Sequence, residues 1–347
     1  MAKILPVTMS DVGRAAGVSQ AAVSLAFRSD PSIPAATRQR IFAVARRLGY
    51  RRHAAISALM AQVRARKPMA IKAELGALTF WSDRAAFEQN PTWQEQWRGA
   101  QARARELGYA LEEFWTGSPG MSLRRLSSVL QARNIEGVLV FPLPTPQGLK
   151  FPFDRFSAIA IGYTLESPLV HRVVTAHFDS VLIALSELRS RGYANIGLVL
   201  DEHMSQRVRR NWKAAFYAYG LELGRVDSAA ILSLPSQGAP ERLGKWLRRF
   251  RPDAVLCGGP QPIRAWLREL GLSAPADIGI VRLANIQPEE RCACIDEKWR
   301  QVGAAAVDLL VGQLHRGQRG IPERPMLTLV RGEWVEGDSV RRPIKPA

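Results

Sequence analysis

Short apolar runs alternate with longer amphipathic runs between residues 74 and 283, and this rhythm strongly constrains the fold of the 347-residue chain. The apolar runs are ELGALTF, YALEEFW, EGVLVFP, FSAIAIG, NIGLVL, AAIL, DAVLC and IGIVRL. They lack strict polar alternation, which is typical of strands that are covered on both faces. Strands that alternate with helices predict parallel sheets built from βαβ units.

The helices expected between these strands fall into two groups. The first group comprises residues 91–107 and 121–133, and the second group lies near 178–191, 205–219, 239–250 and 261–270. Two such groups predict two doubly wound subdomains with a cleft between them. In folds of this kind, ligands bind at the carboxyl ends of the strands.

The stretch TMSDVGRAAGVSQAAVSLAF, which begins at Thr8, predicts two short helices instead of a strand. Thr8 and Asp11 form a variant of the capping box that starts a helix, with Met9, Val12 and Ala15/Ala16 on one face. Gly17 interrupts this helix, and Ser19 can cap the next one. Two short helices joined by about four residues that include a glycine have the spacing of a helix-turn-helix.

A third helix follows in SIPAATRQRIFAVARRLGY, entering through Pro34 and stopping at Gly49. Its expected buried face consists of Ile41, Val44, Ala45 and Leu48. In a helix-turn-helix the second helix enters the major groove of DNA. Its outward side chains here are Gln20, Ala21, Ser24 and Leu25. Glutamine can pair with adenine, whereas alanine and leucine can only contact thymine methyl groups or sugars.

The positive charge of the chain is concentrated at this end. Residues 1–67 hold twelve Lys or Arg and two acids, whereas the whole chain has a net charge of +17. A concentrated basic segment is the electrostatic footprint of a protein that binds a polyanion.

The stretch VTMSDVGRAAGVSQAAVSLAFRSDPSIPAATRQRIFAVARRLGY resembles the headpiece of the LacI/GalR family of bacterial transcription regulators. The similarity runs through all three helices and the closing L-G-Y. Pro34 stands where the family usually has Ser. Leu25 stands where an Arg or another polar residue is common, which weakens any guanine contact. The residues expected to contact double-stranded DNA are Thr8, Ser19, Gln20, Ala21, Ser24, Leu25, Arg28, Tyr50, His53 and Leu59.

The basic stretch RRHAAISALMAQVRARK then resembles the family's hinge, with a short helix around residues 53–61. In the family, the residue nine positions after the Tyr of L-G-Y is a leucine that wedges into the minor groove. Here this position is Leu59, counted from Tyr50. Such a wedge unstacks one base step and bends the duplex. Arg52 and His53 replace the usual Pro and Asn/Ser, so this hinge is expected to start differently.

The resemblance continues through NPTWQEQWRGAQARARELGY and IDEKWRQVGAAAVDLLVGQL and implies a core like the sugar-binding periplasmic proteins. The expected fold is an all-α helix-turn-helix headpiece plus an α/β core of two doubly wound parallel-sheet subdomains, with three crossovers. The headpiece is expected at 1–50, the hinge and linker at 51–70, and the core at 71–340. Within the core, the N-subdomain is expected at about 71–163 and 295–324, and the C-subdomain at about 164–294 and 325–340.

The expected effector pocket departs from the family pattern. Ala176-His177, Gly259-Pro260 and Ala284-Asn285 stand where family members often carry acids or amides that bind sugar hydroxyls. The remaining candidates are Trp81, Phe87, His177, Arg207, Arg209, Asn285, Glu297 and Trp299. Aromatic faces can stack on sugar rings, and an arginine can hold a carboxylate or phosphate. The sequence therefore slightly favours an anionic, sugar-derived effector over a neutral sugar.

Other classes of protein fit the sequence less well. An enzyme is disfavoured because the chain has no P-loop, no G-x-S-x-G and no H-E-x-x-H. An exported solute-binding protein is disfavoured because we find no export signal beside the basic N-terminal segment. No cofactor is expected, and the C-x-C of Cys292 and Cys294 is not a zinc spacing.

The favoured interpretation is a cytoplasmic, homodimeric transcription regulator, most simply a repressor, that binds a near-palindromic operator and has no membrane partner. Its operator affinity would be modulated by a small molecule between the subdomains. The altered pocket keeps one alternative open, a ligand-independent DNA-binding or architectural protein.

Overall fold

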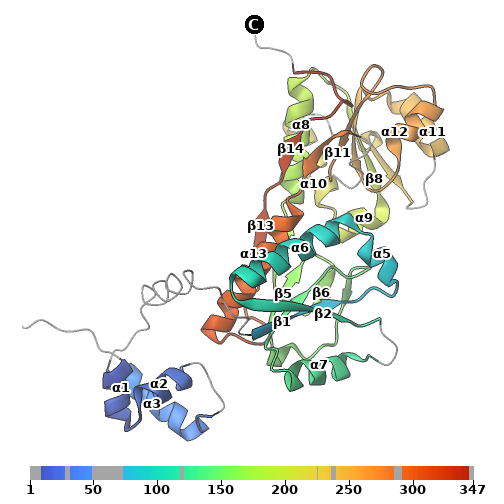
Figure 1. Cartoon of the computed structure of the whole chain (residues 1–347). Helices are drawn as coiled ribbons and strands as arrows, with labels where there is room; N and C mark the ends of the chain where they lie inside the picture. Colours follow the sequence, from blue (N-terminus) through green and yellow to red (C-terminus); the bar gives the residue numbers. More distant parts are fainter. Residues whose placement is uncertain are drawn as a thin grey trace, which may run out of the picture. The chain divides into compact units, whose positions relative to one another are not determined.

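The computed structural model describes residues 9–27, 32–48, 73–117, 121–224, 226–235, 240–284 and 291–343. They belong to two compact units, an N-terminal helical headpiece and a core that starts at Ala73 (Figure 1).

Three helices form the headpiece, as the sequence predicts: α1 (Met9–Ala16), α2 (Gln20–Ala26) and α3 (Ala35–Arg47). Helix α1 ends at Gly17, which adopts a left-handed φ of 64°. There the backbone N–H of Val18 donates to the carbonyl of Gly13 at 2.9 Å. A left-handed glycine just after a helix satisfies carbonyls of the last turn and lets the chain reverse direction.

Each of the three helices turns small or apolar side chains into the headpiece core. The buried side chains are Val12, Ala16, Val23, Ala26, Ile41, Val44 and Ala45, and Phe27 and Leu48 pack partly buried against them. Ala15, expected beside Ala16, is exposed. The reason is the helical period, because Ala16 lies four residues from Val12 and Ala15 faces a different direction.

The first sheet of the core is wholly parallel, with strand order β13-β7-β5-β3-β1-β2. Its strands are β1 (Ala73–Thr79), β2 (Tyr109–Trp115), β3 (Gly137–Val140), β5 (Ser157–Ile161), β7 (His171–Thr175) and β13 (Leu327–Val330). The helices of this N-subdomain are α5 (Arg84–Glu88), α6 (Pro91–Glu106), α7 (Leu123–Ala132) and α13 (Trp299–Arg316). A small pair, β4 (Gln147–Gly148) and β6 (Leu165–Ser167), lies apart from the sheet. Helices α6 and α7 cover opposite faces of the sheet, which buries both faces (Figure 1).

The second sheet has the order β14-β12-β11-β10-β8-β9 and is parallel except for β14, which is antiparallel to β12. Its strands are β8 (Ile196–Asp201), β9 (Ile231–Leu234), β10 (Ala254–Gly258), β11 (Gly279–Arg282), β12 (Ala293–Asp296) and β14 (Glu333–Val335). The helices of this C-subdomain are α8 (His177–Ser190), α9 (Glu202–Arg207), α10 (Asn211–Glu222), α11 (Pro240–Phe250) and α12 (Ile263–Glu269). The doubly wound architecture predicted from the strand and helix rhythm is confirmed.

The single helix predicted near 205–219 is two helices. Helix α9 ends at Arg207 and α10 begins at Asn211. Between them, Arg209 and Arg210 both take left-handed backbone angles, with φ of 52° and 57°. Two consecutive left-handed residues cannot continue a right-handed helix, so the chain breaks there.

The chain passes between the sheets later than the expected subdomain boundaries. Strand β7 lies in the first sheet, so the first passage comes at Ala176, before α8, and not near residue 163. The second follows β12 and leads into α13. Strand β13 also belongs to the first sheet, so the third passage lies between Val330 and Glu333 and not near residue 324. Residues 171–175 carry a histidine and an arginine, and we did not predict them as a buried strand.

Helices α6 and α13 pack backbone against backbone. A Cβ atom added at Gly99 would lie 1.9 Å from the carbonyl oxygen of Arg300, and one added at Gly303 would lie 1.9 Å from that of Gln96. Only glycine permits this approach.

Candidate nucleic-acid interface and effector site

The start of α2 is the part of the headpiece predicted to contact bases. Ser19 adopts an extended conformation, and its Oγ accepts a hydrogen bond from the Ala22 N–H at 3.1 Å, so it caps the helix as expected. Leu25 is partly buried. The side chains of Gln20, Ala21 and Ser24 lie outside the described part, as do the whole residues Thr8, Arg28, Tyr50, His53 and Leu59. Their roles stay predictions.

The described part of the headpiece is strongly basic. Over 9–27 and 32–48 its acid is Asp11, whereas its arginines are Arg14, Arg38, Arg40, Arg46 and Arg47. The Arg14–Asp11 contact is a loose one of 3.6 Å between exposed groups, and such pairs neutralise little. The last four residues of α3 include Arg46 and Arg47, both exposed. This charge suits a phosphate backbone.

Three predicted effector residues meet where the chain passes between the subdomains. The Glu297 carboxylate contacts His177 Nδ1 at 2.8 Å and accepts a hydrogen bond from Trp299 Nε1 at 3.0 Å. The backbone carbonyl of Glu297 accepts a bond from the Thr175 hydroxyl at 3.3 Å. Glu297 is 5% exposed. These bonds tie the passage after β7 to the passage after β12, and they occupy both oxygens of the carboxylate.

A second group joins the two subdomains at another point. Trp81 and Phe87 pack edge-on against the ring of Trp93. Arg207 of the C-subdomain lies 5.6 Å from the ring centroid of Trp81. Its guanidinium donates to the backbone carbonyls of Leu143 and Pro144 in the N-subdomain. Burial lowers the pKa of Arg207 to about 10, which leaves it charged at neutral pH. Arg207 thus links the two subdomains through hydrogen bonds.

Arg209 lies apart from Arg207, with its guanidinium 5.8 Å from the ring centroid of Tyr163. Tyr163 follows β5 and also lies near His177, with 6.2 Å between ring centroids. Burial raises the pKa of Tyr163, while the nearby positive charges of Arg209 and Arg172 and a hydrogen bond with the Asn211 side chain lower it. Sequence reasoning missed Tyr163 and Arg172. A charged residue between apolar neighbours in LVHRVVT was a signal that could have found Arg172.

The strand ends of the second sheet hold a polar network of their own, which sequence reasoning also missed. Gln261 Nε2 donates to the Asp201 carboxylate at 2.8 Å. Buried Arg282 donates to the carbonyls of Gly259 and Gln261 at 3.2 and 3.0 Å. These groups bond one another, so they support the backbone at the site where the family pattern of acids is lost. Asn285, the remaining candidate, lies outside the described residues.

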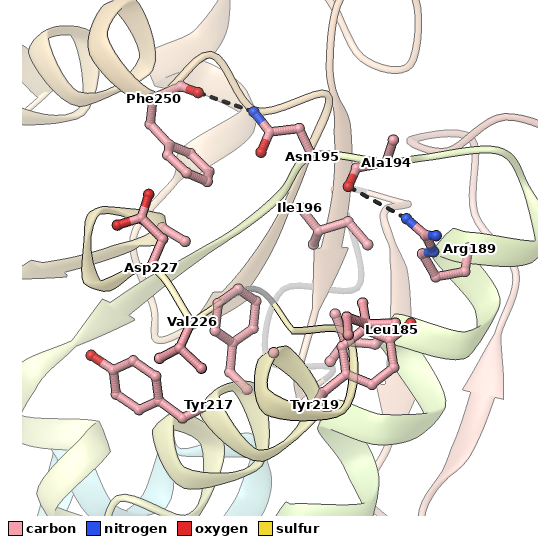
Figure 2. Close-up of a pocket in the computed structure, with 14 residues that line it drawn as sticks. Leu185, Arg189, Ala194, Asn195, Ile196, Tyr217, Tyr219, Val226, Asp227 and Phe250 are labelled. Carbon is pink, nitrogen blue, oxygen red and sulfur yellow. Dashed lines mark hydrogen bonds between the residues drawn. The ribbon is translucent and has the colours of Figure 1, made fainter.

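A cavity of about 330 Å³ lies elsewhere, within the C-subdomain beside α8 and α10 (Figure 2). Aromatic side chains such as Phe216 and Phe250 line it. Its polar groups bond to nearby backbone: Asn195 donates to the carbonyl of Phe250 at 3.0 Å, and Arg189 to that of Ala194 at 3.4 Å. None of the predicted effector residues lines this cavity.

The described residues contain no helix long and apolar enough to cross a membrane. The same residues show no group of three or more His, Cys, Asp or Glu that could hold a metal ion. Cys257, Cys292 and Cys294 are buried, and the described residues place none of them in a disulfide.

A basic helix-turn-helix headpiece on a core of two doubly wound sheets defines a class, the DNA-binding transcription regulators with an effector domain like the periplasmic binding proteins. The family described as "Bacterial regulatory proteins, lacI family" matches residues 8–53, and "Periplasmic binding protein-like domain" matches residues 185–340. The headpiece is thus similar to the bacterial regulatory proteins of the lacI family, and most of the C-subdomain is similar to the periplasmic binding protein-like domain.

Relatives match along most of the chain. The "HTH-type transcriptional regulator PtxS" of Pseudomonas putida is 26% identical over 333 residues, which cover 92% of each chain. The protein of the same name from Pseudomonas plecoglossicida is 28% identical over 345 residues, covering 91% of this chain and 96% of that one.

Solved structures share the fold. A complex of the transcriptional regulator CelR with cellobiose has a TM-score of 0.59 at 16% identity, covering 96% of this chain and 99% of that one. The lac repressor dimer bound to operator and the anti-inducer ONPF has a TM-score of 0.57 at 19% identity, covering 97% and 100%.

Proposed function

We propose that this chain is a cytoplasmic repressor that binds a near-palindromic operator as a homodimer and responds to a small sugar or sugar-derived molecule. The observation that carries the proposal is the meeting of predicted effector residues from both subdomains. His177 and Trp299 both bond the Glu297 carboxylate where the chain passes between the sheets. The solved relatives bound to operator and to cellobiose support the same assignment by analogy.

On DNA, each headpiece inserts residues 20–27 into the major groove of one half-site. The twofold symmetry of the dimer then demands a near-palindromic operator. Arginine contacts to phosphate supply affinity but not sequence choice, so binding falls steeply with salt. Two hinge helices meet at the centre, where each Leu59 pries open the minor groove.

The effector acts through the angle between the subdomains. A ligand bound between them changes how the two sheets approach each other, and with this the spacing of the two hinges. It shifts the equilibrium only as far as its affinities for the two arrangements differ.

Selection of random duplex DNA by the full-length protein at two salt concentrations tests this function. We expect a near-palindromic consensus with a deformable central step, bound less tightly at the higher salt. Salt-sensitive binding without a consensus would contradict a sequence-specific repressor. The selected site then serves in a screen for small molecules that change operator affinity.

The hinge has its own test. Leu59→Ala removes the wedge, so we expect it to weaken operator binding by at least about tenfold, since unstacking a base step depends on an apolar side chain. Binding to an unrelated duplex of the same length should change little. Equal losses on both duplexes would reject the wedge.

A second candidate function is a ligand-independent DNA-binding or architectural protein. It is favoured by one observation, the absence of acids at Ala176, Pro260 and Ala284. An operator affinity that no small molecule alters would support it.

A further inference from the structure

Arg172 is a cation placed inside the core. It lies on β7 and is 6% exposed. Its Nη2 donates to the carbonyl of Leu165 at 2.9 Å, and the described residues offer this guanidinium no ion pair and no other hydrogen bond. Buried charges in proteins are normally paired, because removing an unpaired charge from water is costly. Arg172 therefore has donor capacity left for a partner that the described part of the chain does not supply.

A second cation, Arg209, lies over the ring of Tyr163. Burial lowers the pKa of Arg172, and the positive charge of Arg209 lowers it further. The left-handed backbone of Arg209 and Arg210 interrupts the helix and brings Arg209 to this place. Like charges disfavour each other's charged form, and an anion bound by both would remove this cost.

The nearby carboxylate of Glu297 already has hydrogen-bond partners. Glu297 is bonded to His177 and Trp299, as described above, and so its carboxylate does not pair with Arg172 or Arg209. Arg207, which the sequence suggested as an anion ligand, instead donates to the carbonyls of Leu143 and Pro144.

We propose that Arg172 and Arg209 bind the anionic group, a carboxylate or a phosphate, of the effector, with the Tyr163 hydroxyl as a third donor. This inference rests on the proposed function and names the effector's class: a sugar acid or a sugar phosphate. Arg172 contributes a preorganised guanidinium from the N-subdomain, and Arg209 contributes a second one from the C-subdomain. An anion shared by both holds the subdomains together and so favours one arrangement of the core.

The test uses the full-length protein and pairs of probes that differ in charge alone. Hexonates and hexuronates supply the carboxylate, hexose phosphates supply the phosphate, and the matching alditols and hexoses are the neutral controls. Calorimetric titration measures affinity without any need for the operator. We expect one of the two anionic classes to bind, and its neutral partner to bind at least about tenfold more weakly, since charge-assisted hydrogen bonds are lost.

Three variants locate the binding. Arg209→Gln changes an exposed side chain and should weaken the anion about ten- to a hundredfold, with little effect on the neutral partner. Arg172→Lys keeps the charge but not the two-pronged geometry, and should weaken the anion by a smaller factor. Arg189→Gln is the matched control, because it removes an arginine from the cavity of Figure 2 and should leave the affinity unchanged.

The possible outcomes distinguish a failure of the anion site from a failure of the proposed repressor function. Equal binding of anionic and neutral partners, or an unchanged affinity in Arg209→Gln, would overturn the anion site while leaving a regulated repressor intact. Loss of binding in Arg189→Gln alone would move the site to the cavity of Figure 2. If no probe binds, the anion site is rejected. The effector screen with the selected operator then decides separately whether the protein is regulated at all.

Discussion

Single glycines decide how closely the helices of the N-subdomain can approach. At Gly303 of α13 a methyl group would meet the carbonyl oxygen of Gln96 on the neighbouring helix. We expect Gly303→Ala to lower the free energy of unfolding by about 3 kcal/mol, the upper end of the usual cost of overpacking. The backbone of α6 cannot move aside as a flexible side chain would. Thermal or urea unfolding of the full-length protein measures the change.

The matched control is Gly312→Ala on the same helix. There the added methyl group would approach the guanidinium of Arg316 at 3.1 Å, the mobile end of a long side chain. Since alanine favours a helix over glycine by up to about 1 kcal/mol, this variant should be neutral or slightly stabilising. Equal destabilisation by both substitutions would mean that the close contact of α6 and α13 does not cause the loss.

At the scale of the element, helix α2 depends on its cap, because it has only seven residues. Isolated helices of this length are not stable. We expect Ser19→Ala to destabilise α2 by about 1 kcal/mol, since the Ala22 N–H loses its acceptor. Faster hydrogen exchange of the α2 amides in the full-length protein measures this effect.

Ser19→Asp separates the cap from the contact with DNA. Aspartate caps a helix as well as serine does, so hydrogen exchange in α2 should remain slow. Its negative charge, however, repels phosphate, so operator binding should weaken. Unchanged exchange in Ser19→Ala would argue that packing alone holds α2.

At the scale of the whole core, Arg207 links the two sheets. Arg207→Met keeps the apolar stem but removes the hydrogen bonds to Leu143 and Pro144. We expect a loss of about 1.5–3 kcal/mol in the free energy of unfolding, the usual value for hydrogen bonds to a charged donor. X-ray scattering should also report a more open core, because a contact between the subdomains is gone. The control is Arg210→Met, at an exposed neighbouring residue, which should change neither the free energy of unfolding nor the scattering. Identical effects of the two variants would show that the hydrogen bonds of Arg207 do not link the subdomains.

Local sequence patterns by themselves determined much of this protein. Caps, glycine breaks and the helical period predicted the three headpiece helices, and apolar runs predicted most strands of both sheets. These signals depend on neighbours within a few residues, so they are visible in the sequence. The family resemblance, and not these local patterns, placed His177, Glu297 and Trp299 among the candidate effector residues.

Tertiary structure alone decided the long-range pairings. Strands β7 and β13 are far apart in the sequence but pair with each other in the first sheet, and this moved two of the expected subdomain boundaries. The break between α9 and α10 separated Arg207 from Arg209 and gave them different surroundings. Arg172 became a candidate ligand only when its buried guanidinium was found without an ion pair among the described residues. Burial and charge pairing are properties of the packed molecule, because they depend on side chains that are distant in sequence.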